Sequence, residues 1–386
     1  MSLAQELVAA LRAVLPGPGP VALHEPCFAG NEWKYLKDCL DSGWVSSVGS
    51  YVDRFEDELA RFTGAKRAVA VVNGTAALQV ALRLAGVTAG DEVIVPALTF
   101  VATANAVAYL GATPHFADSA EATLGLDPAA LARHLAQVAV ARDGQCLNRQ
   151  TGRVMRAVVP MHVFGHPVDL EGLQRVCDDY GLALVEDAAE SLGSYYHGRH
   201  TGTFGRLATL SFNGNKTITT GGGGAILTND EELGRLAKHL TTTAKPPHPW
   251  AYAHDQLGYN YRLPNLNAAL GCAQMEQLPE FLRRKRRLAE AYAQGLAGLT
   301  GARFFREPPG CQSNYWLNAL ILDRGREAEL TPCLEAANQA GYMTRPAWEL
   351  MHRLPMYRAC PRMDLPVAES LAGRILNLPS GPRLLV

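Results

Sequence analysis

The 386-residue chain lacks an excess of charge of either sign. Its 36 lysines and arginines nearly balance 37 aspartates and glutamates, which leaves a formal net charge of -1. Proteins that are attracted to nucleic acid or to an anionic membrane usually carry a basic excess. We therefore expect neither partner, and the balance favours a protein that acts on small molecules.

Cysteine patterns and long apolar runs are also missing. The eight cysteines form no CxxC pair and no regular framework. No apolar run reaches the roughly 18 residues that a membrane-spanning helix needs, and residues 1–15 lack the basic start and continuous apolar stretch of a signal peptide. We expect a soluble protein of the reducing cytoplasm, with no metal site.

The first two thirds of the chain alternate between two periodicities. After a short amphipathic helix, the breaker cluster at residues 16–20 predicts a surface connection. Helical patterns then alternate with short apolar runs, which lie at residues 68–72, 92–96, 113–117, 157–161, 183–186 and 209–212. This alternation predicts an α/β fold with a mainly parallel sheet covered by helices.

The last third has a different composition. A proline-rich stretch at residues 245–249 precedes a long helical segment at about 265–299, and residues 315–378 predict a small α+β domain. We therefore predict three units. They are an N-terminal helix and linker at 1–30, a large domain at 31–250, and a bridging helix with a small C-terminal domain at 251–386.

Lys216 follows a buried strand, in the Asn/Gly-rich turn that begins at Ser211. A single lysine in a loop is usually a solvated cation, so its neighbours must decide its role. Lysine attacks a carbonyl only when it is unprotonated, and the apolar end of a strand can lower its pKa from about 10.4. Lys216 is thus a candidate Schiff-base lysine.

Carboxylates gather at the end of an earlier strand. Glu186, Asp187 and Glu190 stand where open α/β sheets bind ligands, although an aspartate there can also cap the next helix. Taken with Lys216, Asp187 suits a pyridoxal cofactor, whose ring nitrogen needs a carboxylate to stay protonated and to draw electrons from a carbanion.

A strand followed by Gly74 and Thr75 opens a helix, whose free N–H groups can hold a phosphate. Such turns serve tight packing as often as anion binding. Other motifs fail on spacing, because residues 214–217 do not form a P-loop and residues 221–227 do not complete GxGxxG. His162 and His166 stand four residues apart, but Gly165 and Pro167 argue against a helix that would bring them to one face as a metal pair.

With these residues assembled, the chain resembles the DegT/DnrJ/EryC1/StrS family of sugar-nucleotide aminotransferases from Asn31 to Pro379. The resemblance rests on several motifs in order: Asn73–Leu78, Pro96–Phe100, His162–Gly165, Glu186–Glu190, Ser211–Lys216, Thr219–Gly221 and Gly258–Arg262. It implies the fold-type I architecture and a homodimer with shared active sites. It also implies pyridoxal 5'-phosphate on Lys216, with pyridoxamine 5'-phosphate as the intermediate form.

The resemblance also assigns roles to individual residues. Asp187 would pair with the ring nitrogen, Phe100 would stack on the ring, and Glu190 would lie near the ring hydroxyl. The phosphate would be held by the amides of Gly74 and Thr75, by the hydroxyls of Thr75 and Ser211, and by Asn260 of the neighbouring subunit. One departure is Gly222, where many relatives carry glutamate.

Residues 42–49 and 345–357 look like the branch of the family in legionaminic acid or bacillosamine biosynthesis. This suggests L-glutamate as donor and a UDP-linked 4-keto-6-deoxy-N-acetylhexosamine as acceptor, although Trp348 and Tyr357 can equally be core aromatics. Two rival functions remain. A pyridoxamine-dependent sugar dehydratase of the family would carry histidine in place of Lys216, and a regulatory or sensor protein would bind the cofactor without turnover.

Overall fold

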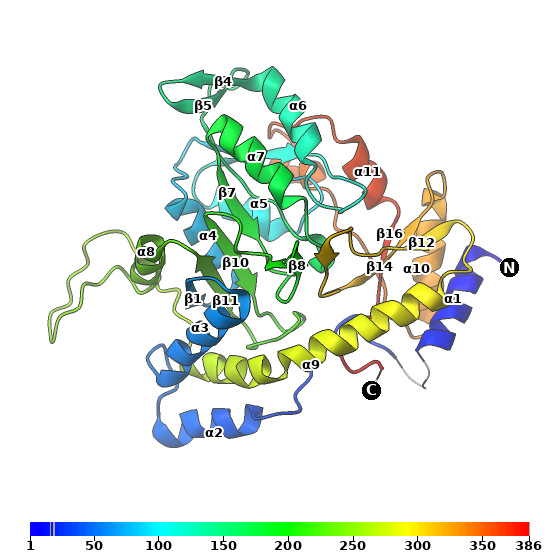
Figure 1. Ribbon diagram of the computed structural model, residues 1–386, viewed down its shortest axis with the longest axis horizontal. Coiled ribbons are helices and arrows are strands. Elements are labelled where there is room, and N and C mark those ends of the chain that lie inside the picture. The colour runs from blue at the N-terminus through cyan, green and yellow to red at the C-terminus, as the bar shows by residue number, and fades with distance from the viewer. Residues whose placement is uncertain (16, 18–19, 386) are drawn as a thin grey trace.

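The computed structural model describes residues 1–15, 17 and 20–385, so most of the predicted connection at residues 16–20 lies outside the described residues. A seven-stranded sheet forms the centre of the molecule (Figure 1). Its strands, in spatial order, are β1 (Arg67–Val71), β11 (Gly224–Thr228), β10 (Leu207–Ser211), β7 (Ala183–Asp187), β6 (Met155–Val158), β2 (Glu92–Pro96) and β3 (Thr113–Ala117).

The sheet is mainly parallel, as predicted. Strands β10, β7, β6, β2 and β3 pair in parallel, whereas β11 runs antiparallel to both β1 and β10. Strand β2 is buried along its whole length, which is why the sequence shows continuous apolar runs there instead of alternation. Strand β11 was not predicted, because its start lies in a run of glycines.

Helices cover both faces of this sheet. On one face, Leu78, Val80 and Leu82 of α4 (Gly74–Leu84) pack in the largest core cluster. On the other face, Phe55 of α3 (Ser50–Thr63) meets Phe212, with ring centroids 5.1 Å apart. The remaining helices of this region are α2 (Glu32–Ser42), α5 (Val101–Ala108), α6 (Pro128–Val138), α7 (Leu170–Tyr180) and α8 (Glu231–Thr241).

The long helix α9 (Asn265–Gly295) runs from the large sheet to a second, antiparallel sheet (Figure 1). That sheet has the order β12 (Ala302–Phe304), β14 (Asn318–Leu322), β16 (Ile375–Leu378) and β15 (Arg345–Pro346). The same part of the chain contains two helices, α10 (Leu330–Gln339) and α11 (Pro366–Ala372). The helix was predicted to extend to residue 299, but its C-cap is Leu296.

The N-terminal helix α1 (Leu3–Val14) does not stand apart from this second sheet. Its Leu7 and Leu11 are fully buried in a cluster with Tyr292 of α9 and Leu320 of β14. Burying such side chains stabilises the fold by about 1.5–3 kcal/mol each. The division of the chain at residues 30 and 250 stays a prediction.

Short hairpins complete the fold. They are β4 (Ala139–Arg142) with β5 (Gln145–Asn148), and the small sheet of β13 (Cys311–Gln312), β8 (Tyr195–Tyr196) and β9 (Arg199–His200). Among the described residues, none of the helices has the length and apolar character that crossing a membrane requires.

Candidate active site

One cavity lies at the carboxyl ends of the parallel strands, where polar side chains that follow different strands converge. Its volume is about 330 Å³. The predicted site residues that line it are Gly74, Thr75, Phe100, Asp187, Glu190, Ser211 and Lys216. The structure thus brings residues separated by more than 140 positions in the chain into one cavity.

The floor of the cavity includes the N-terminus of α4. Asn73 caps this helix, and its side-chain oxygen accepts a hydrogen bond of 2.8 Å from the amide of Ala76. The first N–H groups of a helix have no acceptor within the helix. A Cβ atom at Gly74 would lie 3.0 Å from Cβ of Ser211, so the glycine allows the start of α4 to lie close against the end of β10, which brings the free helix amides near the Ser211 hydroxyl.

Strand β7 separates two neighbouring carboxylates, because successive side chains of a strand point to opposite faces. Asp187 lines the cavity, whereas Glu186 is not among the lining residues. The carboxylate of Asp187 accepts hydrogen bonds from the Thr103 hydroxyl (2.8 Å) and the Ala189 amide (3.2 Å). Burial raises the pKa of Asp187, and these two donors and the charge of Lys216 oppose that shift.

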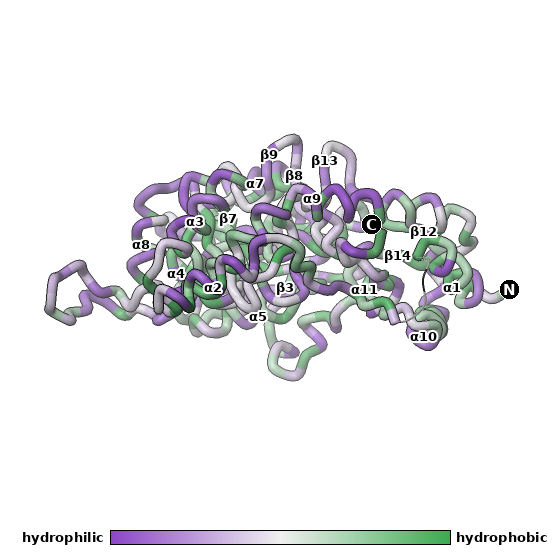
Figure 2. The backbone as a smooth tube through the Cα atoms, turned by 90° about the horizontal axis from the view of Figure 1, so that it is seen from below, coloured by the Kyte–Doolittle hydropathy of each residue, from purple (hydrophilic) through white to green (hydrophobic). Residues whose placement is uncertain are grey.

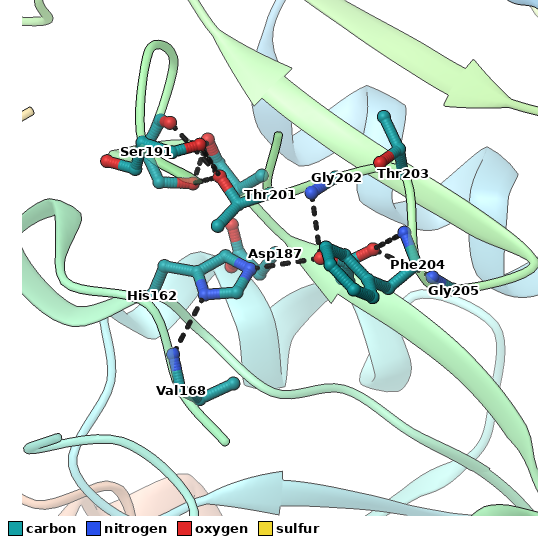
Figure 3. A network of polar contacts seen from close by, with 12 residues as sticks. His162, Val168, Asp187, Ser191, Thr201, Gly202, Thr203, Phe204 and Gly205 are labelled. Carbon is teal, nitrogen blue, oxygen red and sulfur yellow. Dashed lines mark hydrogen bonds and ion pairs between the residues drawn. The ribbon is translucent and has the colours of Figure 1, made fainter. Parts of the chain in front are cut away.

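Glu186 lies in a fully buried polar network, and Figure 3 labels its partners His162, Gly202, Phe204 and Gly205. Its carboxylate accepts 2.7 Å hydrogen bonds from those three backbone amides and lies 3.2 Å from Nε2 of His162. Burial alone would raise the pKa of Glu186, but these partners lower it below its ordinary value. Glu186 therefore holds the loop after β9 in place.

Lys216 has two neighbours in the cavity. Its Nζ lies 3.4 Å from Oε1 of Glu190 and 4.0 Å from the ring centroid of Trp316. The indole Nε1 of Trp316 donates a 2.7 Å hydrogen bond to the carbonyl of Asn215. The aromatic ring is thus fixed against the turn that carries the lysine, and it shields the amine from water.

Glu190 is buried beside that amine. Its Oε2 accepts a 2.9 Å hydrogen bond from the amide of Phe164. Burial raises the pKa of Glu190 from 4.5 to about 7, although the charge of Lys216 acts in the opposite direction. A carboxyl group with this pKa can take up or release a proton near neutral pH.

The comparisons with known proteins agree with this geometry. The family model described as the DegT/DnrJ/EryC1/StrS aminotransferase family matches residues 26–385. The chain belongs to this family. It is a pyridoxal phosphate-dependent sugar aminotransferase with an α/β, fold-type I architecture, as the sequence predicted.

Individual relatives align with nearly the whole chain of the aminotransferase. The GDP-perosamine synthase of Vibrio cholerae is 39% identical over 94% of this chain and 95% of its own length. The solved structure of the aminotransferase TlmJ from Streptoalloteichus hindustanus is 30% identical, with a TM-score of 0.84 and 94% of each chain covered. S. venezuelae DesV is 31% identical, with a TM-score of 0.80, over 99% of this chain and 92% of its own.

The cavity of the aminotransferase fits pyridoxal phosphate. Gly74 and Thr75, at the N-terminus of α4, line the cavity together with Ser211, and the open helix amides there can hold a phosphate. Asp187 offers a buried carboxylate for a ring nitrogen, and Lys216 offers an amine for the aldehyde carbon. These assignments to individual residues stay predictions.

Asn260 is not among the residues that line this cavity. It is exposed, and its Oδ1 accepts a 3.1 Å hydrogen bond from Nε of Arg262. Its backbone pairs with Thr242, at the base of a protruding loop. The predicted role of Asn260 toward a neighbouring subunit therefore stays a prediction.

The sequence missed Trp316 and left Trp348 undecided. Both line the cavity of the aminotransferase. Tyr357, in contrast, is buried, packs on Phe116 and donates a 2.5 Å hydrogen bond to Asn105, as a core aromatic does. The only signal for Trp316 in the sequence was that tryptophans stand in the segment that forms the C-terminal sheet.

Two further residues that the sequence singled out are Gly222 and His166. Gly222 lines the cavity, and a Cβ added to it would meet no atom within 4 Å. His166 is fully buried between Phe305 and Tyr315, and burial lowers its pKa to about 3. Within the described residues, no group of three or more metal-binding side chains is found.

Proposed function

We propose that the enzyme transfers the amino group of L-glutamate to the keto carbon of a nucleotide-linked sugar. The acceptor that we propose is a UDP-4-keto-6-deoxy-N-acetylhexosamine, used in the cytoplasm to make amino sugars for a nonulosonic acid or a surface polysaccharide such as lipopolysaccharide. One observation carries the proposal: Lys216, Asp187 and the N-terminus of α4 meet in one cavity.

The roles of the residues follow from their positions. Bound pyridoxal phosphate supplies an aldehyde carbon for amines and a ring that accepts electrons. Asp187 binds the ring nitrogen and keeps it protonated, and Phe100, which is half exposed at the cavity wall, covers the ring. The amides of Gly74 and Thr75 and the hydroxyls of Thr75 and Ser211 bind the phosphate.

With the cofactor and glutamate bound, Lys216 would be the group that moves a proton at the donor α-carbon. Its amine would lie in a water-poor site, where it would act as the general base. Glu190 at 3.4 Å takes up or returns a proton at Nζ of Lys216, since its pKa of about 7 makes both of its forms accessible. The same two groups serve the second half-reaction, in which the acceptor receives the amino group.

We also propose a homodimer with shared sites. The loop between α8 and α9 extends away from the body of the molecule in two perpendicular views (Figures 1 and 2). It carries Trp250, Tyr252 and Leu257, each at least 76% exposed. Large exposed apolar side chains are typical of a surface that a partner covers. Asn260, at the base of this loop, would then reach the phosphate in the second subunit.

The nucleotide of the acceptor has a second candidate. Relatives from Vibrio cholerae and Caulobacter vibrioides, 39% and 36% identical, are named GDP-perosamine synthase, which favours a GDP-linked sugar. The presence of Lys216 argues against the dehydratase alternative, and the complete set of cofactor residues argues against a sensor that only binds.

An amino-transfer assay tests the proposal. The holoenzyme is incubated with L-glutamate and a 4-keto-6-deoxy sugar linked to UDP or to GDP, and the products are detected by mass spectrometry. We expect 2-oxoglutarate and a UDP-linked 4-amino sugar in equal amounts. Amination of the GDP-linked sugar alone would assign the enzyme to the second candidate, and cofactor binding without any transfer would favour the sensor.

A further inference from the structure

The ring of Trp316 lies over the amine of Lys216. The distance from Nζ to the ring centroid is 4.0 Å, which is within the range where an aromatic face attracts a cation. Both side chains are largely buried, since Trp316 is 5% exposed and the side chain of Lys216 is 12% exposed. Because little water competes at this depth, the attraction is stronger than it would be on the surface.

The position of the Trp316 ring is fixed by hydrogen bonds at three of its atoms. The indole Nε1 donates to the carbonyl of Asn215 (2.7 Å), and the backbone amide donates to Oδ1 of Asn314 (2.8 Å). The carbonyl of Trp316 accepts a 3.2 Å hydrogen bond from Nζ of Lys285, which is fully buried on α9. The ring therefore cannot turn its face away from Lys216 without breaking at least one of these bonds.

The segment that carries Trp316 is also tied to the turn that holds Glu190. The side-chain amide of Asn314 donates to the carbonyls of Glu190 (2.8 Å) and Leu192 (2.9 Å). The carboxylate of Glu190 lies 3.4 Å from Nζ of Lys216. The amine of Lys216 thus lies near two fixed partners, an aromatic face and a carboxyl group, which Asn314 joins to each other.

These two partners differ in what they do with a proton. Glu190 can accept one, because burial raises its pKa to about 7. The indole ring accepts none, but it attracts the charged form of the lysine over the neutral form. It therefore stabilises the lysine after a proton has arrived and leaves that proton on Nζ. The charge of Lys216 also acts on Asp187 and His24, although neither pairs with its amine among the described residues.

We propose that Trp316 is a positioning residue for amino transfer, and that its ring face holds Lys216 as an ammonium ion when the lysine has taken up a proton. The ring makes the amine a stronger base and keeps it in place until the proton is returned. This inference rests on the role proposed for Lys216. Trp348 lines the same cavity, but within the described residues it makes no cation–π contact with Lys216, so it does not share this role.

Competitive labelling of amines in the cofactor-free protein tests the inference without turnover. Trace acetic anhydride is added at a series of pH values, and mass spectrometry measures acetylation of the peptide that contains Lys216. Only the neutral amine reacts, so the pH of half-maximal labelling reports protonation, whereas the plateau at high pH reports accessibility. Trp316→Leu should lower the half-maximal pH by about 0.4–1.5 units, because the ammonium loses the ring face.

Two further variants separate the ring from its surroundings. Trp316→Phe and Trp316→Leu both lose the hydrogen bond to Asn215, so the difference between them belongs to the aromatic face. The phenyl ring attracts a cation less strongly than indole does, and Trp316→Phe should therefore give the smaller shift. Trp348→Leu is the matched control, since it removes a tryptophan from the same cavity and should leave the half-maximal pH of Lys216 unchanged.

The donor half-reaction of the holoenzyme supplies a second measurement. The rate at which L-glutamate changes the cofactor absorbance should fall by about two- to thirtyfold in Trp316→Leu. The loss should lie in the rate at saturating glutamate and not in the glutamate concentration that gives half of that rate, because the ring acts on the lysine and not on the donor.

Three labelling results would overturn the inference: no shift in Trp316→Leu, an equal shift in Trp348→Leu, or a change in the plateau alone, which would mean that the ring only limits access to the amine. Failure of the proposed function is recognised separately. Amino transfer by Lys216→Ala would contradict the role of the lysine, whereas the labelling shifts test the contact between ring and amine directly.

Discussion

Glu186 and Asp187 are adjacent in the sequence but lie in opposite environments. Glu186 is surrounded by three backbone amides and His162, which lower its pKa, whereas Asp187 faces a cavity with a pKa raised by burial. The first carboxylate has its hydrogen-bonding capacity filled by the protein. The second keeps capacity for a ligand. The comparison teaches that the alternation of a single strand can separate a structural carboxylate from a functional one.

The largest effect is expected for Asp187, the carboxylate of this pair that lines the cavity. Asp187→Asn removes the charge that keeps the cofactor nitrogen protonated, while an amide oxygen can still accept from Thr103. We expect kcat/KM for amino transfer to fall about 10³-fold, or about 4 kcal/mol, with little change in the urea midpoint of unfolding. Activity near that of the wild type would contradict the assignment.

The next largest effect is expected for Glu186, the carboxylate of this pair that is enclosed by the protein. Glu186→Gln replaces an oxygen with an NH₂ group, which turns a donor toward amides that need an acceptor. We expect the free energy of unfolding in urea to fall by about 3 kcal/mol. The matched control is Glu232→Gln, which breaks an exposed pair with Arg235 and should cost less than about 1 kcal/mol. Equal effects in the two variants would refute the distinction.

A smaller effect than those at Asp187 and Glu186 is expected at Glu190. Its pKa is about 7 in the folded protein and 4.5 ordinarily, so between those values the folded state holds a proton that the unfolded state has released. Its contribution to stability is therefore present below about pH 4.5 and is lost as the pH rises through 7.

Glu190→Gln should remove this pH dependence. Urea unfolding of the cofactor-free protein at pH 5 and pH 8 should show a difference between the two pH values that is smaller in the variant, by on the order of 1–2 kcal/mol. The same difference in the variant and the wild type would show that Glu190 does not titrate in this range.

Much of the fold could be read from the sequence because its strands are short and continuously apolar. The predicted strands at residues 92–96 and 113–117 matched the observed bounds of β2 and β3. Lys216, Asp187 and Gly74 could be grouped because each stands at or shortly after the end of a predicted strand of one mainly parallel sheet. The carboxyl ends of such strands necessarily meet at the same edge.

What the sequence could not supply depends on contacts between distant segments. Strand β11 begins at Gly224, where a Cβ would lie 2.5 Å from the carbonyl carbon of Asn73, so this glycine serves close packing that periodicity does not reveal. Trp316 faces Lys216 from a position 100 residues later. Lys285 is fully buried in a helix that reads as amphipathic and charged, and only the packing identifies it.

The most direct test of the central claim is the absorbance spectrum of the purified holoenzyme before and after L-glutamate, in the wild type and in Lys216→Ala. The account predicts a visible cofactor band that shifts to the near ultraviolet when glutamate is added to the wild type, and no comparable band or turnover in the variant. A variant that keeps both the band and amino transfer, or a wild type that shows no band even with added pyridoxal phosphate, would contradict the assignment of Lys216 as the residue that carries the cofactor.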